Sequence, residues 1–185
     1  MKKKIKEFEG LLKACIDNKE IVKINRQVTD GEANIYGYLL GVSDDFLLVQ
    51  NEDDFTLDGY SIIRMTQFQS IRCDKFDKAI KKILKKEGIQ KKGYGIKKPL
   101  KLDSWESIFK QLKKRGQNVV VECEFLKTPS FTLGSIQSVN SKSVEILYFD
   151  ATGKLDKEPT KIKYKDITLV KFDDRYTNVL SKYTH

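Results

Sequence analysis

The chain has 185 residues and a formal net charge of +9, with 39% hydrophobic and 33% charged residues. This apolar content is sufficient for a buried core, which excludes a wholly disordered chain, and the length fits one large domain or two small ones. The sequence contains no run of about 20 apolar residues, the length that a transmembrane helix needs.

The N-terminal segment and the cysteines indicate where the protein works. Residues 1–10 begin with lysines, as a signal peptide does, but two glutamates replace the apolar region, so we expect no export. Cys15, Cys73 and Cys123 are far apart and belong to no CxxC or Cys/His cluster. We therefore expect reduced thiols in a cytoplasmic protein, with neither a disulfide framework nor a zinc site.

The positive charge is concentrated in the middle of the chain. Residues 81–103 carry a net charge of +7, whereas residues 1–80 carry −2 and residues 104–185 carry +4. The basic stretch also contains three glycines and a proline, which are typical of a loop. We therefore predict a first domain over residues 1–80, a basic helix end and linker over 81–103, and a second domain over 104–185.

The two flanking segments repeat one order of apolar and glycine positions. A shift of 97 residues aligns Gly37 with Gly134, and a shift of 99 residues aligns Ile71 with Val170. The shared order along most of both halves indicates a tandem duplication. A chance match between short strands is the alternative.

In the first copy, a helical stripe of apolar residues comes first, at positions i, i+3, i+4 and i+7: Phe8, Leu11, Leu12 and Cys15. Short strands separated by turn residues are expected over residues 35–42, 46–51, 60–65 and 68–73. A terminal helix follows, in which Ile80, Ile83 and Leu84 form the apolar stripe and the lysines between them point to solvent.

The second copy repeats this order. Asp103 or Ser104 is placed to cap its helix, whose apolar stripe consists of Trp105, Ile108, Phe109 and Leu112. Alternation of apolar and polar residues over 119–126 predicts the first strand. The remaining strands are expected over residues 131–138, 144–149, 160–164 and 167–172.

The strands are expected to close into barrels. Five short strands in about 65 residues would leave exposed edges in an open sheet, whereas a small barrel capped by the preceding helix removes them. Gly37 and Gly134 stand at the same place in the second strand and suit the sharp bend of such a barrel. We predict a mainly β fold with short flanking helices, consisting of two tandem five-stranded small barrels, each preceded by a helix.

Two motifs resemble those of the Sm-like (LSm) family. Residues 37–49 read GYLLGVSDDFLLV, which is similar to the first Sm motif with its glycine and acidic turn. Ile71-Arg72-Cys73 is similar to the Ile-Arg-Gly that ends the second motif. The resemblance covers residues 5–75 and, more distantly, 104–173, and other SH3-like small barrels share much of it. It implies helix-capped five-stranded barrels that assemble through edge strands four and five.

The resemblance also implies candidate RNA-binding residues. In RNA-binding members, an asparagine after the acidic turn and the arginine of Ile-Arg-Gly hold a uridine base. Leu47 and Val144 stand near the asparagine position here, which implies an altered uridine pocket. The remaining candidates are Arg72, Asp44, Lys171 and Asn140. Two of these residues also have a structural alternative to ligand binding. Arg72 would form a salt bridge at the rim of the barrel, and Asp44 would be an ordinary turn residue.

The linker supplies further candidates. Lysines that neutralise phosphates release counterions and bind nucleic acid without sequence preference, and the candidates of this kind are Lys91, Lys92, Lys97 and Lys98. Tyr94, between two glycines, is placed to stack on an exposed base. The alternative is a solvated helix face. A membrane surface is disfavoured because no set of bulky aromatic residues accompanies the lysines.

The sequence offers little for catalysis. The one histidine is His185, the last residue, so no Ser-His or Cys-His pair and no histidine-based metal site is expected within the fold. No GxxxxGK[ST] loop is present. The carboxylate clusters fall in expected turns, which makes an acid-only hydrolase or a Mg²⁺ site a weaker alternative. We expect no catalytic residue, no metal and no cofactor.

These observations predict a non-enzymatic binding protein whose ligand is RNA, captured by the linker lysines and the barrel loops. The alternative is a protein-interaction or assembly module, such as an adaptor, a regulator or a toxin-neutralising protein. Such a module would use its barrel edge strands to join a protein partner or further copies of itself. The salt dependence of binding distinguishes the two hypotheses. The affinity for RNA falls steeply as the ionic strength rises, whereas the affinity of edge-strand pairing changes little.

Overall fold

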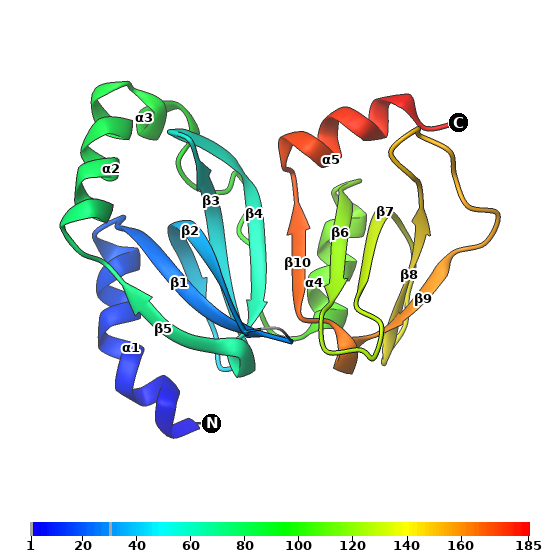
Figure 1. Ribbon diagram of the computed structural model, residues 1–185, viewed down its shortest axis with the longest axis horizontal. Helices are drawn as coiled ribbons and strands as arrows, with labels where there is room; N and C mark the ends of the chain where they lie inside the picture. The colour runs from blue at the N-terminus through cyan, green and yellow to red at the C-terminus, as the bar shows by residue number, and fades with distance from the viewer. Residues whose placement is uncertain (1, 30) are drawn as a thin grey trace. The chain divides into compact units, whose positions relative to one another are not determined.

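The chain divides into two compact units, Met1–Pro99 and Leu100–His185, which we call unit 1 and unit 2 (Figure 1). The computed structural model describes residues 2–29 and 31–185, with side chains from residue 8 onward. Each unit is mainly β and consists of a helix followed by five antiparallel strands and then one or more short helices.

Unit 1 begins with helix α1 (Lys2–Asp17). Its strands are β1 (Ile21–Val28), β2 (Gly31–Val42), β3 (Phe46–Asp53), β4 (Thr56–Arg64) and β5 (Phe68–Arg72). The 3-10 turn η1 (Met65–Gln67) precedes β5, and helices α2 (Lys75–Lys86) and α3 (Ile89–Gly93) follow it. The strands are arranged in the order β5-β1-β2-β3-β4, with α1 and α2 on the side that carries β1 and β5 (Figure 1).

Unit 2 repeats this plan. Helix α4 (Trp105–Lys114) packs against β7 and β8. The strands are β6 (Asn118–Cys123), β7 (Ser130–Val139), β8 (Ser143–Tyr148), β9 (Thr160–Lys163) and β10 (Leu169–Phe172), in the order β10-β6-β7-β8-β9. The 3-10 turn η2 (Tyr164–Asp166) precedes β10, and α5 (Arg175–Leu180) and the 3-10 turn η3 (Ser181–Tyr183) end the unit.

The expected closure into barrels is wrong. A closed barrel requires the two end strands of the order to pair, but among the described residues of unit 1, β5 and β4 are not neighbours. The same holds for β10 and β9 in the described part of unit 2. Each unit is therefore an open antiparallel sheet. An open sheet leaves edge strands, but the two ends of the whole strand order, β5 and β9, have only five and four residues. In addition, β9 carries lysines, which oppose pairing with a further strand.

The helical stripes are largely where the periodicity placed them. All four apolar residues of the α4 stripe are buried, and the Ser104 hydroxyl accepts a hydrogen bond from the Ser107 N–H as the N-cap, so this prediction is confirmed. In α1, Leu12 and Cys15 are buried but Leu11 is exposed. In α2, Leu84 is buried, whereas Ile83 is 39% exposed, contrary to the expected stripe.

Both second strands contain a glycine at a point where two backbones meet. A Cβ atom added to Gly37 would lie 1.9 Å from the Gln50 carbonyl oxygen, and one added to Gly134 would lie 2.0 Å from the Leu147 carbonyl oxygen. Contacts this short with backbone atoms cannot be relieved by a side-chain rotation. The two copies therefore share one packing constraint at equivalent positions.

Gly134→Ala is expected to destabilise unit 2 by about 3 kcal/mol, because the added methyl group forces β7 and β8 apart. Urea unfolding monitored by the fluorescence of Trp105, which is buried in unit 2, measures this loss. Gly10→Ala is the control, since an added Cβ there meets nothing within 4 Å and alanine favours a helix by up to about 1 kcal/mol. An unchanged midpoint for Gly134→Ala would contradict the packing argument.

Candidate anion-binding pocket

In unit 2, the turn between β7 and β8 is held against η2 by the backbone. The Asn140 N–H donates to the Ser143 carbonyl at 2.9 Å, which closes the turn, and the Tyr164 N–H donates to the Lys142 carbonyl at 3.0 Å. The second bond joins the turn to the end of β9. Residues far apart in the sequence are thereby brought together.

Tyr164 fixes the same junction through its side chain. Its ring stacks on Phe109, with centroids 5.9 Å apart and planes at 9°, and its hydroxyl donates to the Asn140 carbonyl at 2.7 Å. Burial raises the pKa of Tyr164 to about 12, so the phenol keeps its proton at neutral pH and remains a donor. The ring is thus held by the core of the unit on one side and by the turn on the other.

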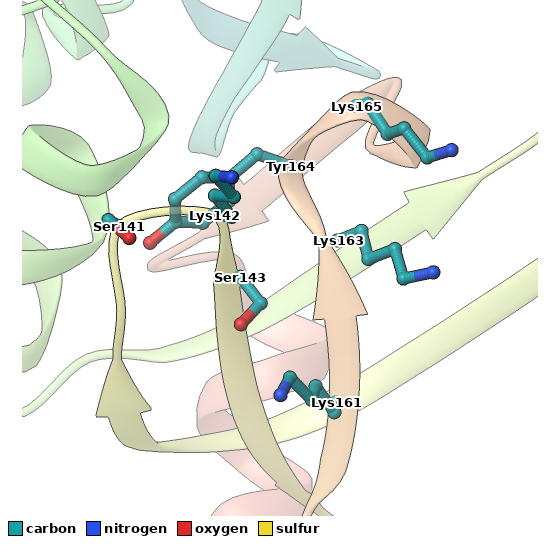
Figure 2. Close-up of a pocket in the computed structure, with 7 residues that line it drawn as sticks. All are labelled: Ser141, Lys142, Ser143, Lys161, Lys163, Tyr164 and Lys165. Atoms are coloured by element: carbon teal, nitrogen blue, oxygen red, sulfur yellow. The ribbon is translucent and has the colours of Figure 1, made fainter.

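A pocket of about 530 Å³ lies at this junction (Figure 2). It is lined by Ser141, Lys142, Ser143, Lys161, Lys163, Tyr164 and Lys165. Figure 2 shows the Tyr164 ring turned back toward the turn that carries Ser141, while Lys163 and Lys165 extend to the opposite side. We call these seven residues the lysine pocket.

The electrostatics of the lysine pocket favour an anion. Its four lysines are exposed, and within the described residues none of them forms an ion pair. Glu145 is the cross-strand neighbour of Lys161, but its carboxylate accepts a hydrogen bond from the Ser138 hydroxyl at 2.6 Å. Several like charges around one hollow raise the local concentration of counter-ions and of anionic ligands.

The alternation of β9 explains why lysines gather there. Ile162 is buried, so Lys161 and Lys163 project from the outward face of the strand. Lys165 follows in η2, and Lys142 is supplied by the turn opposite. Register and turn geometry, which a single sequence does not specify, therefore assemble this cluster.

Unit 1 has the same backbone geometry with the opposite charge. The Ser43 N–H donates to the Phe46 carbonyl at 2.9 Å, and the Met65 N–H donates to the Asp45 carbonyl at 2.8 Å, which reproduces the two bonds of unit 2. In the repeat alignment, however, Asp44 and Asp45 take the places of Ser141 and Lys142. The positions of Lys161, Lys163 and Lys165 are held by Ile62, Arg64 and Thr66.

The candidates from the Sm-like motifs lie apart from the lysine pocket, with one exception. The Arg72 guanidinium donates two hydrogen bonds, of 3.0 and 2.7 Å, to the Asp77 carboxylate. Lys171 forms an ion pair with Glu122 at 2.9 Å. Asp44 is an exposed turn residue of unit 1. Asn140 belongs to the turn that forms the pocket, and its carbonyl accepts the Tyr164 hydroxyl.

The linker candidates divide into two groups. Four lysines are exposed on unit 1: Lys91, Lys92, Lys97 and Lys98. Tyr94 instead packs edge-on against Tyr38, with centroids 4.9 Å apart. Its neighbours are held by Gln50, whose amide donates to the Gly93 carbonyl at 2.7 Å and accepts from the Gly95 N–H at 2.8 Å. The Tyr94 ring is therefore part of the packing of unit 1.

The sequence motifs did not predict the four lysines of the pocket, which are Lys142, Lys161, Lys163 and Lys165. A signal for three of them is present in residues 161–165, which read KIKYK and place lysines at every second position of a predicted strand. The resemblance to Sm motifs instead pointed to Lys171, which lies in the next strand, β10. Lys142 has no local signal, because only the fold brings it to the others.

Comparison with protein-family models, with curated proteins and with solved structures finds no match to the chain. In the described residues, no three His, Cys, Asp or Glu side chains come together as a metal site requires. None of the helices in residues 2–29 and 31–185 has the length and apolar character needed to span a bilayer.

The Arg72–Asp77 pair fixes the start of α2. Asp77 is fully buried, and its carboxylate also accepts the Asp74 N–H at 2.8 Å, while Asp74 caps the helix in return. Burial alone would raise the pKa of Asp77, but the hydrogen bonds from Arg72 and from the Asp74 backbone lower it below its ordinary value. The ionised form is therefore favoured in the folded protein.

Asp77→Asn is expected to cost about 2 kcal/mol at neutral pH, because the Arg72 guanidinium loses the shorter of its two ion pairs and keeps only that with Asp74 at 3.4 Å. A lowered folded-state pKa stabilises the protein above the unfolded pKa of about 3.9, and this contribution is lost as the pH falls through the lower folded value. Urea unfolding at several acidic pH values measures the difference. Asp44→Asn, at an exposed turn, is the control, and equal losses for both variants at neutral pH would contradict the argument.

Proposed function

We propose that the chain is a non-enzymatic RNA-binding protein and that the lysine pocket of unit 2 holds phosphates of the RNA. The observation that carries this proposal is the gathering of four exposed lysines and a fixed tyrosine ring around one hollow of about 530 Å³. Each lysine that neutralises a phosphate releases counterions, which supplies most of the affinity of sequence-independent binding.

The shape of the site suits an extended polyanion. Side chains at i and i+2 on a strand are about 6.8 Å apart, so Lys161 and Lys163 form a regular row along β9. Tyr164 lines the pocket with its ring already held by Phe109, which gives a base a stacking surface that needs little ordering. The hydroxyl of Ser141, which is exposed, adds a donor for phosphate oxygens.

Two further observations support the proposal. The resemblance of residues 37–49 and 71–73 to Sm motifs points to a family with RNA-binding members. The cysteines Cys15, Cys73 and Cys123 are free thiols, which supports a cytoplasmic protein.

The exposed linker lysines of unit 1 would add a weaker and less localised attraction. Among Lys91, Lys92, Lys97 and Lys98, the first two lie on α3 and the others in the segment after it. They are not among the residues that line the lysine pocket. Their contribution is expected to be the general electrostatic one.

The competing proposal is assembly through edge strands. β5 and β9 are end strands of their units, and each has strand neighbours on one side only within the described residues. Lysines on β9 oppose the approach of a further strand, which is a common protection of sheet edges. This observation ranks edge pairing below RNA binding for unit 2.

Replacing Lys161, Lys163 and Lys165 together by glutamine is expected to weaken binding of a labelled oligouridine by about tenfold or more at moderate salt. The dependence of log K on log salt should also become shallower by about 2, since each phosphate contact to a single strand contributes about 0.7. Fluorescence anisotropy across a salt series measures both quantities.

A triple variant with Lys91, Lys92 and Lys97 changed to glutamine is the control, because it removes the same charge from unit 1. Equal losses for the two triples would show that only net charge matters, and a loss confined to the control would assign binding to the linker. If the native chain binds no RNA even at low salt, RNA binding itself is wrong.

A further inference from the structure

The outward face of α2 has apolar side chains that the fold does not bury. Phe76 is 61% exposed and Ile83 39% exposed, and Ala79 between them is exposed as well. The three residues stand at i, i+3 and i+7, so they form one stripe along the helix. The helix is held on its other side by Leu84 and by the Asp77–Arg72 pair.

A stripe of positive charge runs beside this apolar stripe. It consists of Lys75, Lys78, Lys82 and Lys86, all exposed. The first three each precede an apolar residue by one position, which is a rotation of about 100° around the helix. The two stripes touch where the Lys75 ammonium lies 5.2 Å from the centroid of the Phe76 ring.

Nothing on α2 balances this charge. The one acidic residue of the helix, Asp77, is buried and paired with Arg72. Lys81, on the inner side, is paired with Glu20 at 3.0 Å. The exposed face therefore combines an apolar stripe with an uncompensated positive one, and we call it the α2 face.

We propose that the α2 face docks an acidic amphipathic helix of a partner protein. Such a helix is complementary to both stripes of the face. Its apolar stripe would cover Phe76 and Ile83, and carboxylates beside that stripe would pair with the lysines. Recognition of an amphipathic helix through anchors at i, i+3 and i+7 is a common mode of peptide binding. Complementary charge at the rim fixes the orientation and speeds association.

Other occupants satisfy only one of the two features. RNA offers phosphates for the lysines but leaves Ile83 uncovered. A second copy of the chain brings an identical lysine stripe and a net charge of +9, so like charges would meet. A lipid surface requires a wide apolar face, whereas this stripe has two large side chains.

The test uses the full-length protein and a labelled synthetic peptide of about 18 residues, with leucine at i, i+3, i+4 and i+7, glutamate beside this stripe and alanine elsewhere to favour a helix. Anisotropy titration should show binding that Phe76→Ser combined with Ile83→Ser weakens by about tenfold. Added salt and glutamine in place of the glutamates should weaken it too. Phe125→Ser with Phe131→Ser is the matched control, since both side chains are 52% exposed in unit 2.

Absence of peptide binding, or equal losses for the two double variants, overturns the proposal. Phosphatidylserine vesicles are tested in parallel, and binding of vesicles instead of peptide that depends on Phe76 and Ile83 would assign the face to lipid and also overturn it. Circular dichroism melting shows whether each variant is folded. Because both pairs are exposed, the melting temperatures should stay within a few degrees of the parent.

Discussion

The pocket of unit 2 depends on how Tyr164 is held in place. Its ring rests on Phe109 and its hydroxyl donates to the Asn140 carbonyl, so the end of β9 and the turn before β8 have one fixed relation. These two segments supply the lysines that line the pocket. The contacts of a single aromatic residue thus fix the relation between the two segments that line the pocket.

The two units share backbone features at equivalent positions but differ in the charge of their side chains. Both have a glycine at the close approach of the second and third strands, and both join turn and 3-10 helix with equivalent backbone bonds. The side chains on this shared frame differ in charge, with Asp44 and Asp45 in unit 1 opposite Ser141 and Lys142 in unit 2. We therefore propose a phosphate site at this turn in unit 2 and none at the equivalent turn of unit 1, which presents the α2 face elsewhere.

Local periodicity was sufficient to predict the α4 helix and most strands, because burial of a stripe is determined by residues close in the sequence. Closure of the sheets was predicted wrongly, since it depends on the pairing of end strands that no local pattern records. The pocket was missed for the same reason: Lys142 and Lys161 meet only through the fold. Ile83 was assigned to the core because it follows Ile80 by three positions, yet the buried residues of α2 are Asp77 and Leu84 and Ile83 is exposed.

The most direct test of the central claim is an NMR titration of the ¹⁵N-labelled full-length chain with a short oligouridine at low salt. The account predicts that the largest amide shifts occur in residues 141–143 and 161–165, while the equivalent residues 44–46 and 62–66 of unit 1 stay unchanged. Shifts confined to residues 91–98, or spread evenly over the exposed lysines of both units, would contradict the assignment of RNA binding to the lysine pocket.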